Sequence, residues 1–287
     1  MIRVLQLVAD GVMAGATLAV PAIAFNTMYA VLRFPNFAIS GLATIGAFAG
    51  YAANVWGGWP APLALGAAFV AAALASVACE LGALRRLRRS GPLAAAVASV
   101  ALTILLENVV RFGFGNELRG YDLPVFRDWR LGPLRLNPQE IENAACALVA
   151  TAALFLFLGF TRTGRMMRAV ADNPALAALK GIDAGAVAVL ASLLGGGLAG
   201  FGGMLIGLDA SIDPLTGFRV MLSIFAAAVV GGLGSIPGAV LGAVVVGVGE
   251  ECSLLLLDPA YRSAVGFLAI LLVLSFRPRG LLGERAW

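Results

Sequence analysis

The sequence lacks histidine and is poor in charge. None of its 287 residues is histidine, and Asp, Glu, Lys and Arg together make up only 13%. Without histidine, the chain cannot build a serine–histidine triad, a histidine metal site or a histidine proton relay. With 60% hydrophobic residues, it also carries more apolar surface than a water-soluble domain can bury. We therefore expect an integral membrane protein surrounded by lipid.

Motifs for nucleotide hydrolysis and acyl transfer are missing as well. The sequence contains no GxxxxGK[ST] loop and no GxSxG elbow, and the glycine-rich run 195–203 lacks the acidic residue of a dinucleotide-binding unit. This run instead predicts close packing of membrane helices. Cys79, Cys146 and Cys252 form no CxxC pair and are expected to be small buried apolar side chains. We predict no enzyme activity and no bound cofactor, so any ATP that drives this chain is hydrolysed by another subunit.

Long apolar runs predict membrane-spanning helices. One span takes about 20 apolar residues, so the length allows roughly eight to ten spans. We expect an all-α polytopic bundle forming a single domain over residues 1–287, with some short or broken helices. Proline and glycine breakers, such as Pro35 and the turn 57–60, separate the runs. The nine predicted spans are 4–32, 36–54, 61–83, 93–113, 139–160, 183–208, 217–234, 237–257 and 261–276.

The arginines predict the orientation. Basic residues gather in 85–89, 162–180 and 277–285. These groups fall on one side if each span crosses once, and the positive-inside rule makes that side the cytoplasm. The N-terminus and the loop 114–138 would then lie outside, and the C-terminus inside. Because the basic residues stand between apolar runs, the net charge of +4 does not indicate a nucleic-acid partner.

Two segments outside the predicted spans have recognisable local structure. The outer loop has mixed charge, which predicts a small folded cap, with room over 115–137 for a short interfacial helix. On the inner side, Asp172-Asn173-Pro174 is typical of a helix start and Gly181 of a helix end. A short helix over 175–180 could dock into another protein, and a plain solvated loop fits these residues equally well.

Four motifs lie in the same order along the chain as in one transporter family. They are Asn36-Phe37-Ala38, the run 161–182, the run 227–239 and the run 276–283. Together they resemble the permease subunits of ATP-binding cassette importers for branched-chain amino acids. The chain departs from that family at Ile39-Ser40-Gly41, where His-Gly is common. That departure leaves the substrate class open.

The resemblance implies partners and a coupling segment. In that family two permeases, usually non-identical, pair in the bacterial inner membrane. Two ATPase subunits dock below them, and a periplasmic binding protein delivers the substrate. The segment 161–183 would then couple the ATPase subunits to transport, and family substrates include branched-chain and other amino acids, urea, amides and aromatic acids. The candidate coupling residues are Gly164, Arg165, Arg168, Asp172, Asn173, Pro174, Lys180 and Gly181.

Polar residues and helix breaks inside apolar runs are candidates for the translocation pathway. Asn36 and Ser40 stand four apart on one helix face, and the alternative role for Asn36 is to cap the helix that follows Pro35. An ionisable group in a span is costly, so Glu107 should face the interior. The alternative for Glu107 is a structural pair with Arg111 one turn away. The candidate pathway residues are Asn26, Asn36, Phe37, Ser40, Gly41, Glu107 and Asn108.

A self-contained secondary transporter or channel is the second hypothesis. Such a protein would need several intramembrane carboxylates, or broken helices in repeated halves. The sequence offers one deep acid, Glu107, and no clear internal repeat. The sequence therefore favours the importer permease.

Overall fold

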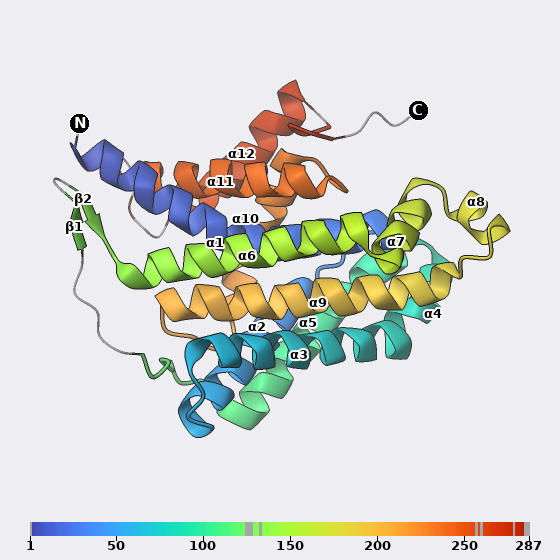
Figure 1. The fold of residues 1–287 in the computed structure, drawn as a ribbon, viewed down its shortest axis with the longest axis horizontal. Helices are drawn as coiled ribbons and strands as arrows, with labels where there is room; N and C mark the ends of the chain where they lie inside the picture. The colour runs from blue at the N-terminus through green and yellow to red at the C-terminus, as the bar shows by residue number, and fades with distance from the viewer. Residues whose placement is uncertain are drawn as a thin grey trace.

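The protein is a helical bundle. The computed structural model describes residues 2–123, 129–131, 134–255, 258, 261–277 and 279–283. Within these residues, six helices are long and apolar enough to cross a membrane, and two shorter apolar helices accompany them. Several of the long helices run side by side along the long axis of the molecule (Figure 1). The predicted all-α membrane bundle is confirmed.

Each of the nine predicted spans coincides with a helix. The helix α2 continues as a π-helix over Ala52–Trp56, and α3 continues through a π-helical turn Glu80–Leu84, α4 and a 3₁₀ turn to Ser90. The helices are α1 Ile2–Leu32, α2 Ile39–Tyr51, α3 Ala61–Cys79, α4 Arg85–Leu87, α5 Pro92–Phe114, α6 Pro138–Phe160, α7 Arg162–Asp172, α8 Pro174–Leu179, α9 Ala184–Asp209, α10 Thr216–Gly231, α11 Ile236–Ser253 and α12 Arg262–Phe276.

The outer loop contains a short strand pair, in keeping with the small folded cap predicted there. In its described part the structure has two antiparallel strands, β1 Trp129–Leu131 and β2 Leu134–Leu136, and no interfacial helix. Residues 124–128 and 132–133 of this loop lie outside the described part of the chain. Nearby, the partly buried Tyr121 donates a hydrogen bond from its hydroxyl to Ala47 O at 2.8 Å. Burial raises the pKa of Tyr121, so this hydroxyl keeps its proton and remains a donor.

Glycines let α9 approach its neighbours closely. The helix α9 packs against α1, α2 and α3. A Cβ added at Gly46 of α2 would lie 2.1 Å from the Cα of Gly200 in α9. A Cβ added at Gly203 would lie 2.1 Å from Ala43 O. The backbones of α2 and α9 are therefore in direct contact, which confirms the packing role predicted for the run 195–203.

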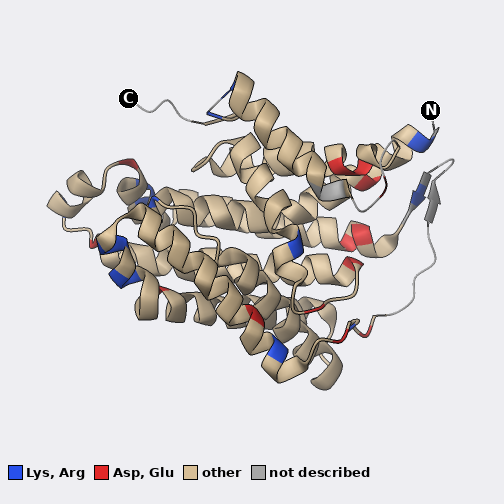
Figure 2. Ribbon diagram, turned by 180° about the vertical axis from the view of Figure 1, so that it is seen from behind, with Lys and Arg blue, Asp and Glu red and all other residues tan. Residues whose placement is uncertain are grey.

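The two ends of the bundle differ in charge and structure. The N-terminus and β1–β2 lie at one end, and α4, α7 and α8 lie at the other (Figure 1). Arginine and lysine positions group at the end that carries α7 and α8 (Figure 2). Two of the three basic groups, 85–89 and 162–180, are thus brought together as predicted.

Candidate functional site

The interruption between α1 and α2 is buried inside the bundle. The helix α1 ends at Leu32 and α2 begins at Ile39, so the predicted break is confirmed, although α2 starts three residues later than expected. Phe34 and Asn36 between them are 1% and 2% exposed. Non-helical backbone at this depth needs protein partners for its N–H and C=O groups.

The helix α5 supplies those partners. Ser99 Oγ accepts a hydrogen bond from Phe37 N at 2.9 Å, and Thr103 Oγ1 donates one to Phe37 O at 2.8 Å. The hydroxyls of Ser40 and Thr103 lie 3.3 Å apart. Ser99 and Thr103 stand one turn apart on α5, so one helix face satisfies both polar groups of the Phe37 backbone.

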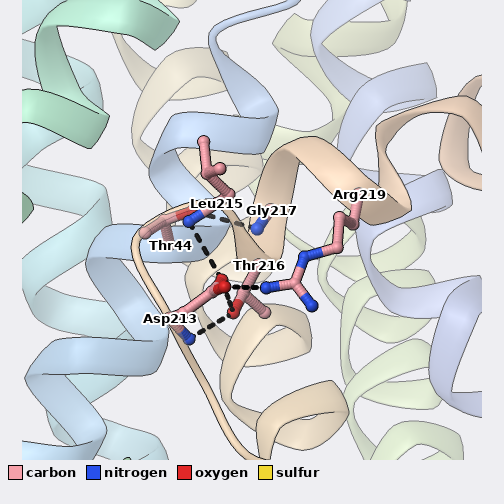
Figure 3. A network of polar contacts seen from close by, with 6 residues as sticks. All are labelled: Thr44, Asp213, Leu215, Thr216, Gly217 and Arg219. Atoms are coloured by element: carbon pink, nitrogen blue, oxygen red, sulfur yellow. Dashed lines mark hydrogen bonds and ion pairs between the residues drawn. The ribbon is translucent and has the colours of Figure 1, made fainter. Parts of the chain in front are cut away.

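The start of α10 meets the start of α2. Gly217 N donates a hydrogen bond to Thr44 Oγ1 at 3.1 Å (Figure 3). A Cβ added at Gly217 would lie 1.9 Å from Ser40 O. Ser40 and Thr44 are both fully buried, so this contact lies inside the bundle. We call the meeting point of residues 34–44, α5 and the start of α10 the junction.

Asp213 organises the turn before α10. Its carboxylate accepts hydrogen bonds from Leu215 N and Thr216 Oγ1, each at 3.1 Å, and forms an ion pair with Arg219 (Figure 3). The side chain of Asp213 thereby caps the turn that leads into α10. These bonds fix the turn at the start of α10, and the Gly217–Thr44 bond joins that turn to α2.

Four of the seven predicted pathway residues come together at the junction. Asn36 Oδ1 accepts a hydrogen bond from Ala38 N at 3.1 Å, so it caps the backbone just before α2, whereas the N-cap residue itself is Ala38. The ring centroids of Phe37 and Phe225 in α10 lie 5.9 Å apart. A Cβ at Gly41 would lie 3.0 Å from Leu106 Cβ, so α2 and α5 are closely packed there. Ser40, whose hydroxyl lies beside that of Thr103, is the fourth predicted pathway residue at the junction.

Asn26, another predicted pathway residue, forms its hydrogen bonds away from the junction. Its amide donates hydrogen bonds to Gly232 O at 3.0 Å and Ser235 O at 2.8 Å, which ties α1 to the turn between α10 and α11. The side chain is fully buried and its Oδ1 has no hydrogen-bond partner. Asn26 thus joins helices at a point separate from the hydrogen bonds of the junction.

Glu107 and Asn108 are neighbours in α5, but one is buried and the other is exposed. Glu107 is buried, as its insertion cost predicted, and its Oε1 lacks a hydrogen-bond partner. Arg111 interacts electrostatically with Glu107, as the predicted pair requires, and its Nη1 donates a hydrogen bond to Asn108 Oδ1 at 3.4 Å. Asn108 is exposed, and its amide also bonds Ile104 O at 2.7 Å. Asn108 therefore faces away from the junction.

The short helix predicted before Gly181 is present as α8. Asn173 Oδ1 accepts a hydrogen bond from Leu176 N at 3.0 Å, and Pro174 is the first helical residue. Gly181 has a φ of +79°, and Ile182 N reaches back to Ala177 O at 3.0 Å. Both predicted caps are confirmed, so the plain-loop interpretation is wrong for this segment.

A second helix, α7, was not predicted. Thr161 caps its start, and the Thr161 Oγ1 accepts a hydrogen bond from Gly164 N at 2.9 Å. A Cβ added at Gly164 would lie 2.5 Å from Leu158 Cα, so a glycine is needed where α7 folds back on α6. Its buried positions are Gly164, Met167 and Val170, and its exposed ones include Arg162, Arg165 and Arg168. This three-residue spacing was the signal available in the sequence.

The outer surface of α7 and α8 carries the remaining predicted coupling residues. Arg165, Arg168, Asp172 and Lys180 are exposed. On α8 the apolar side chains of Leu176 and Leu179 are 55% and 85% exposed. This end of the bundle therefore presents basic and apolar side chains together.

A known protein family matches most of this chain. The family model described as the permease component of the branched-chain amino acid transport system matches residues 7–274. The chain belongs to this permease family. The permease is 32% identical to the high-affinity branched-chain amino acid transport system permease protein LivH of Salmonella typhimurium, over 98% of this chain and 96% of that protein. No solved structure matches it.

Two further relatives extend the comparison. The permease is 30% identical to the high-affinity branched-chain amino acid transport system permease protein BraD of Pseudomonas aeruginosa, over 98% of this chain and 96% of that protein. It is 26% identical to the probable branched-chain amino acid transport permease protein LivH of Methanocaldococcus jannaschii, over 91% and 87%. Along nearly its whole length, the permease resembles transport components.

Proposed function

We propose that this permease is the membrane subunit of an ATP-driven importer for branched-chain or related amino acids. It would act in the bacterial inner membrane as one membrane domain, with α7 and α8 in the cytoplasm and the N-terminus outside. The observation that carries the proposal is the surface of α7 and α8. There, exposed arginines and the exposed Leu176 and Leu179 stand at the end of the bundle where basic residues gather.

Separate ATPase subunits would bind this surface. Leu179 is 85% exposed beyond the end of the long helices, where an apolar side chain gains free energy when another protein covers it. The basic residues of α7 would orient the contact through charge. Because the sequence has no phosphate-binding loop, the ATPase subunits would hydrolyse the ATP.

The junction would form part of the pathway. Two helices start there, and helix N-termini carry partial positive charge that favours an anionic group such as a carboxylate. The rings of Phe37 and Phe225 lie beside it and provide apolar surface. A carboxylate joined to an apolar side chain suits this environment, which favours amino acids or aromatic acids over urea and amides.

Purification with native partners tests the proposal. The tagged permease is extracted from its own membrane in mild detergent, and bound proteins are identified by mass spectrometry. We expect a second, non-identical permease and ATPase subunits with phosphate-binding loops. We also expect a periplasmic binding protein to attach when the substrate is present. Recovery of the permease alone, or only as a homo-oligomer, would favour a self-contained secondary transporter or channel.

A further inference from the structure

Arg33 has an unusual backbone conformation. Its φ is +60°, and among the residues that the structure describes it is the one non-glycine residue with a positive φ. A side chain with a Cβ is disfavoured in this left-handed region, which glycine and asparagine adopt more readily. Such a conformation persists where surrounding contacts hold it.

The Arg33 side chain makes a contact of this kind. Its Nη2 donates a hydrogen bond to Ala171 O in the last turn of α7. Carbonyl groups in the last turn of a helix have no partner within that helix, and a positive charge there also complements the helix dipole. The end of α7 is thus joined to a residue that lies 138 positions earlier in the chain.

From Arg33 the chain leads directly into the junction. Phe34 and Asn36 are buried, and Pro35 between them has a fixed φ. The backbone of Phe37 is held at both its N–H and its C=O by Ser99 and Thr103. The segment 34–38 therefore has little freedom to absorb a displacement of Arg33.

We propose that Arg33 is a positioning residue that passes movement of α7 to the junction. The inference rests on the coupling role proposed for α7 and adds the physical path from that helix to the pathway. When α7 moves with a docked ATPase subunit, the bond to Ala171 draws Arg33 with it. The segment 34–38 then shifts the start of α2 relative to Thr103 and Gly217.

The variant Arg33→Gly tests this path. Glycine accepts the positive φ without strain, so the variant should fold at least as well as the parent while losing the guanidinium. The importer complex, purified with its own partner subunits, is placed in proteoliposomes with its binding protein. Uptake of radiolabelled leucine and ATP hydrolysis are then measured together. We expect ATP hydrolysis to continue and the leucine moved per ATP to fall about ten-fold, the order of change expected from losing one charge-assisted hydrogen bond.

Two further variants sharpen the test. Arg33→Lys keeps the positive charge and a hydrogen-bond donor. It should therefore restore part of the leucine transport per ATP that Arg33→Gly loses. Arg33 and Arg86 are both exposed, and Arg86→Ala, which removes an arginine at the same end of the bundle, should leave the leucine moved per ATP unchanged. If Arg33→Gly moves as much leucine per ATP as the parent protein, the inference is overturned. A parallel loss of uptake, ATP hydrolysis and thermal stability would also overturn it, because that pattern indicates a purely structural role. If the parent complex shows no ATP-dependent uptake, the proposed function fails first, and the inference fails with it.

Discussion

Gly217 lies where α10 packs directly against the backbone of α2. An added Cβ would meet Ser40 O at 1.9 Å and Thr44 Oγ1 at 2.6 Å. The backbone oxygen of Ser40 is part of α2 and has little freedom to move away. Gly66 on α3 offers a matched contrast, because nothing lies within 4 Å of a Cβ added there.

We predict opposite outcomes for alanine at these two glycines. Gly217→Ala should force the junction apart and destabilise the protein by about 1–3 kcal/mol, the usual cost of overpacking. Gly66→Ala should be neutral or slightly stabilising, because alanine favours the helix. Thermal unfolding of the purified complex in detergent, followed by leucine uptake in proteoliposomes, measures both effects. Equal unfolding temperatures for the two variants would contradict the close contact at Gly217.

Individual residues also show why part of the site was predictable. Caps are local, so Asn173 and Gly181 could be recognised from their immediate neighbours. Ser99 and Thr103 could not, because hydroxyls are common in apolar helices and their partner Phe37 lies more than sixty positions away. The burial of Glu107 followed from its insertion cost. The four-residue spacing also brings Arg111 close enough to interact electrostatically with Glu107, but it did not show that the guanidinium bonds Asn108.

At the scale of elements, α7 has one face that packs on the bundle and another that carries its charged side chains. Gly164, Met167 and Val170 hold the helix against the bundle, and the arginines project from the other side. The helix boundaries of the long spans followed from apolar length and from proline and glycine breakers. The helix α7 was missed because it is polar overall and was taken as part of a loop, although its buried positions recur every three residues.

We predict that reversing charge on α7 uncouples the importer. In Arg165→Glu/Arg168→Glu the buried face is untouched, so membrane insertion and folding should be preserved. ATP hydrolysis should continue while uptake falls at least several-fold, because the charge complementarity of the ATPase contact is lost. Arg86→Glu/Arg89→Glu reverses two exposed arginines at the same end and serves as the control. Unchanged uptake in the α7 variant would contradict the coupling role of this segment.

At the scale of the whole molecule, the arginine distribution predicts which end faces the cytoplasm. The segment Arg85–Ser90 and the helices α7 and α8 share one end of the bundle, and the N-terminus lies at the other (Figure 1). Positively charged segments are retained on the cytoplasmic side during insertion. Leu179 on α8 and Leu118 after α5 are both well exposed, at 85% and 66%, so each can report the side on which it lies.

We therefore predict opposite labelling of cysteines placed at these two positions. The background replaces Cys79, Cys146 and Cys252 by alanine, so that each variant has one thiol. In right-side-out membrane vesicles, Leu118→Cys should react with a membrane-impermeant maleimide. Leu179→Cys should react only after the membrane is permeabilised, because the bilayer separates it from the reagent. The reverse pattern would place α7 and α8 outside, where no cytoplasmic ATPase could reach them, and would remove the basis of the coupling proposal.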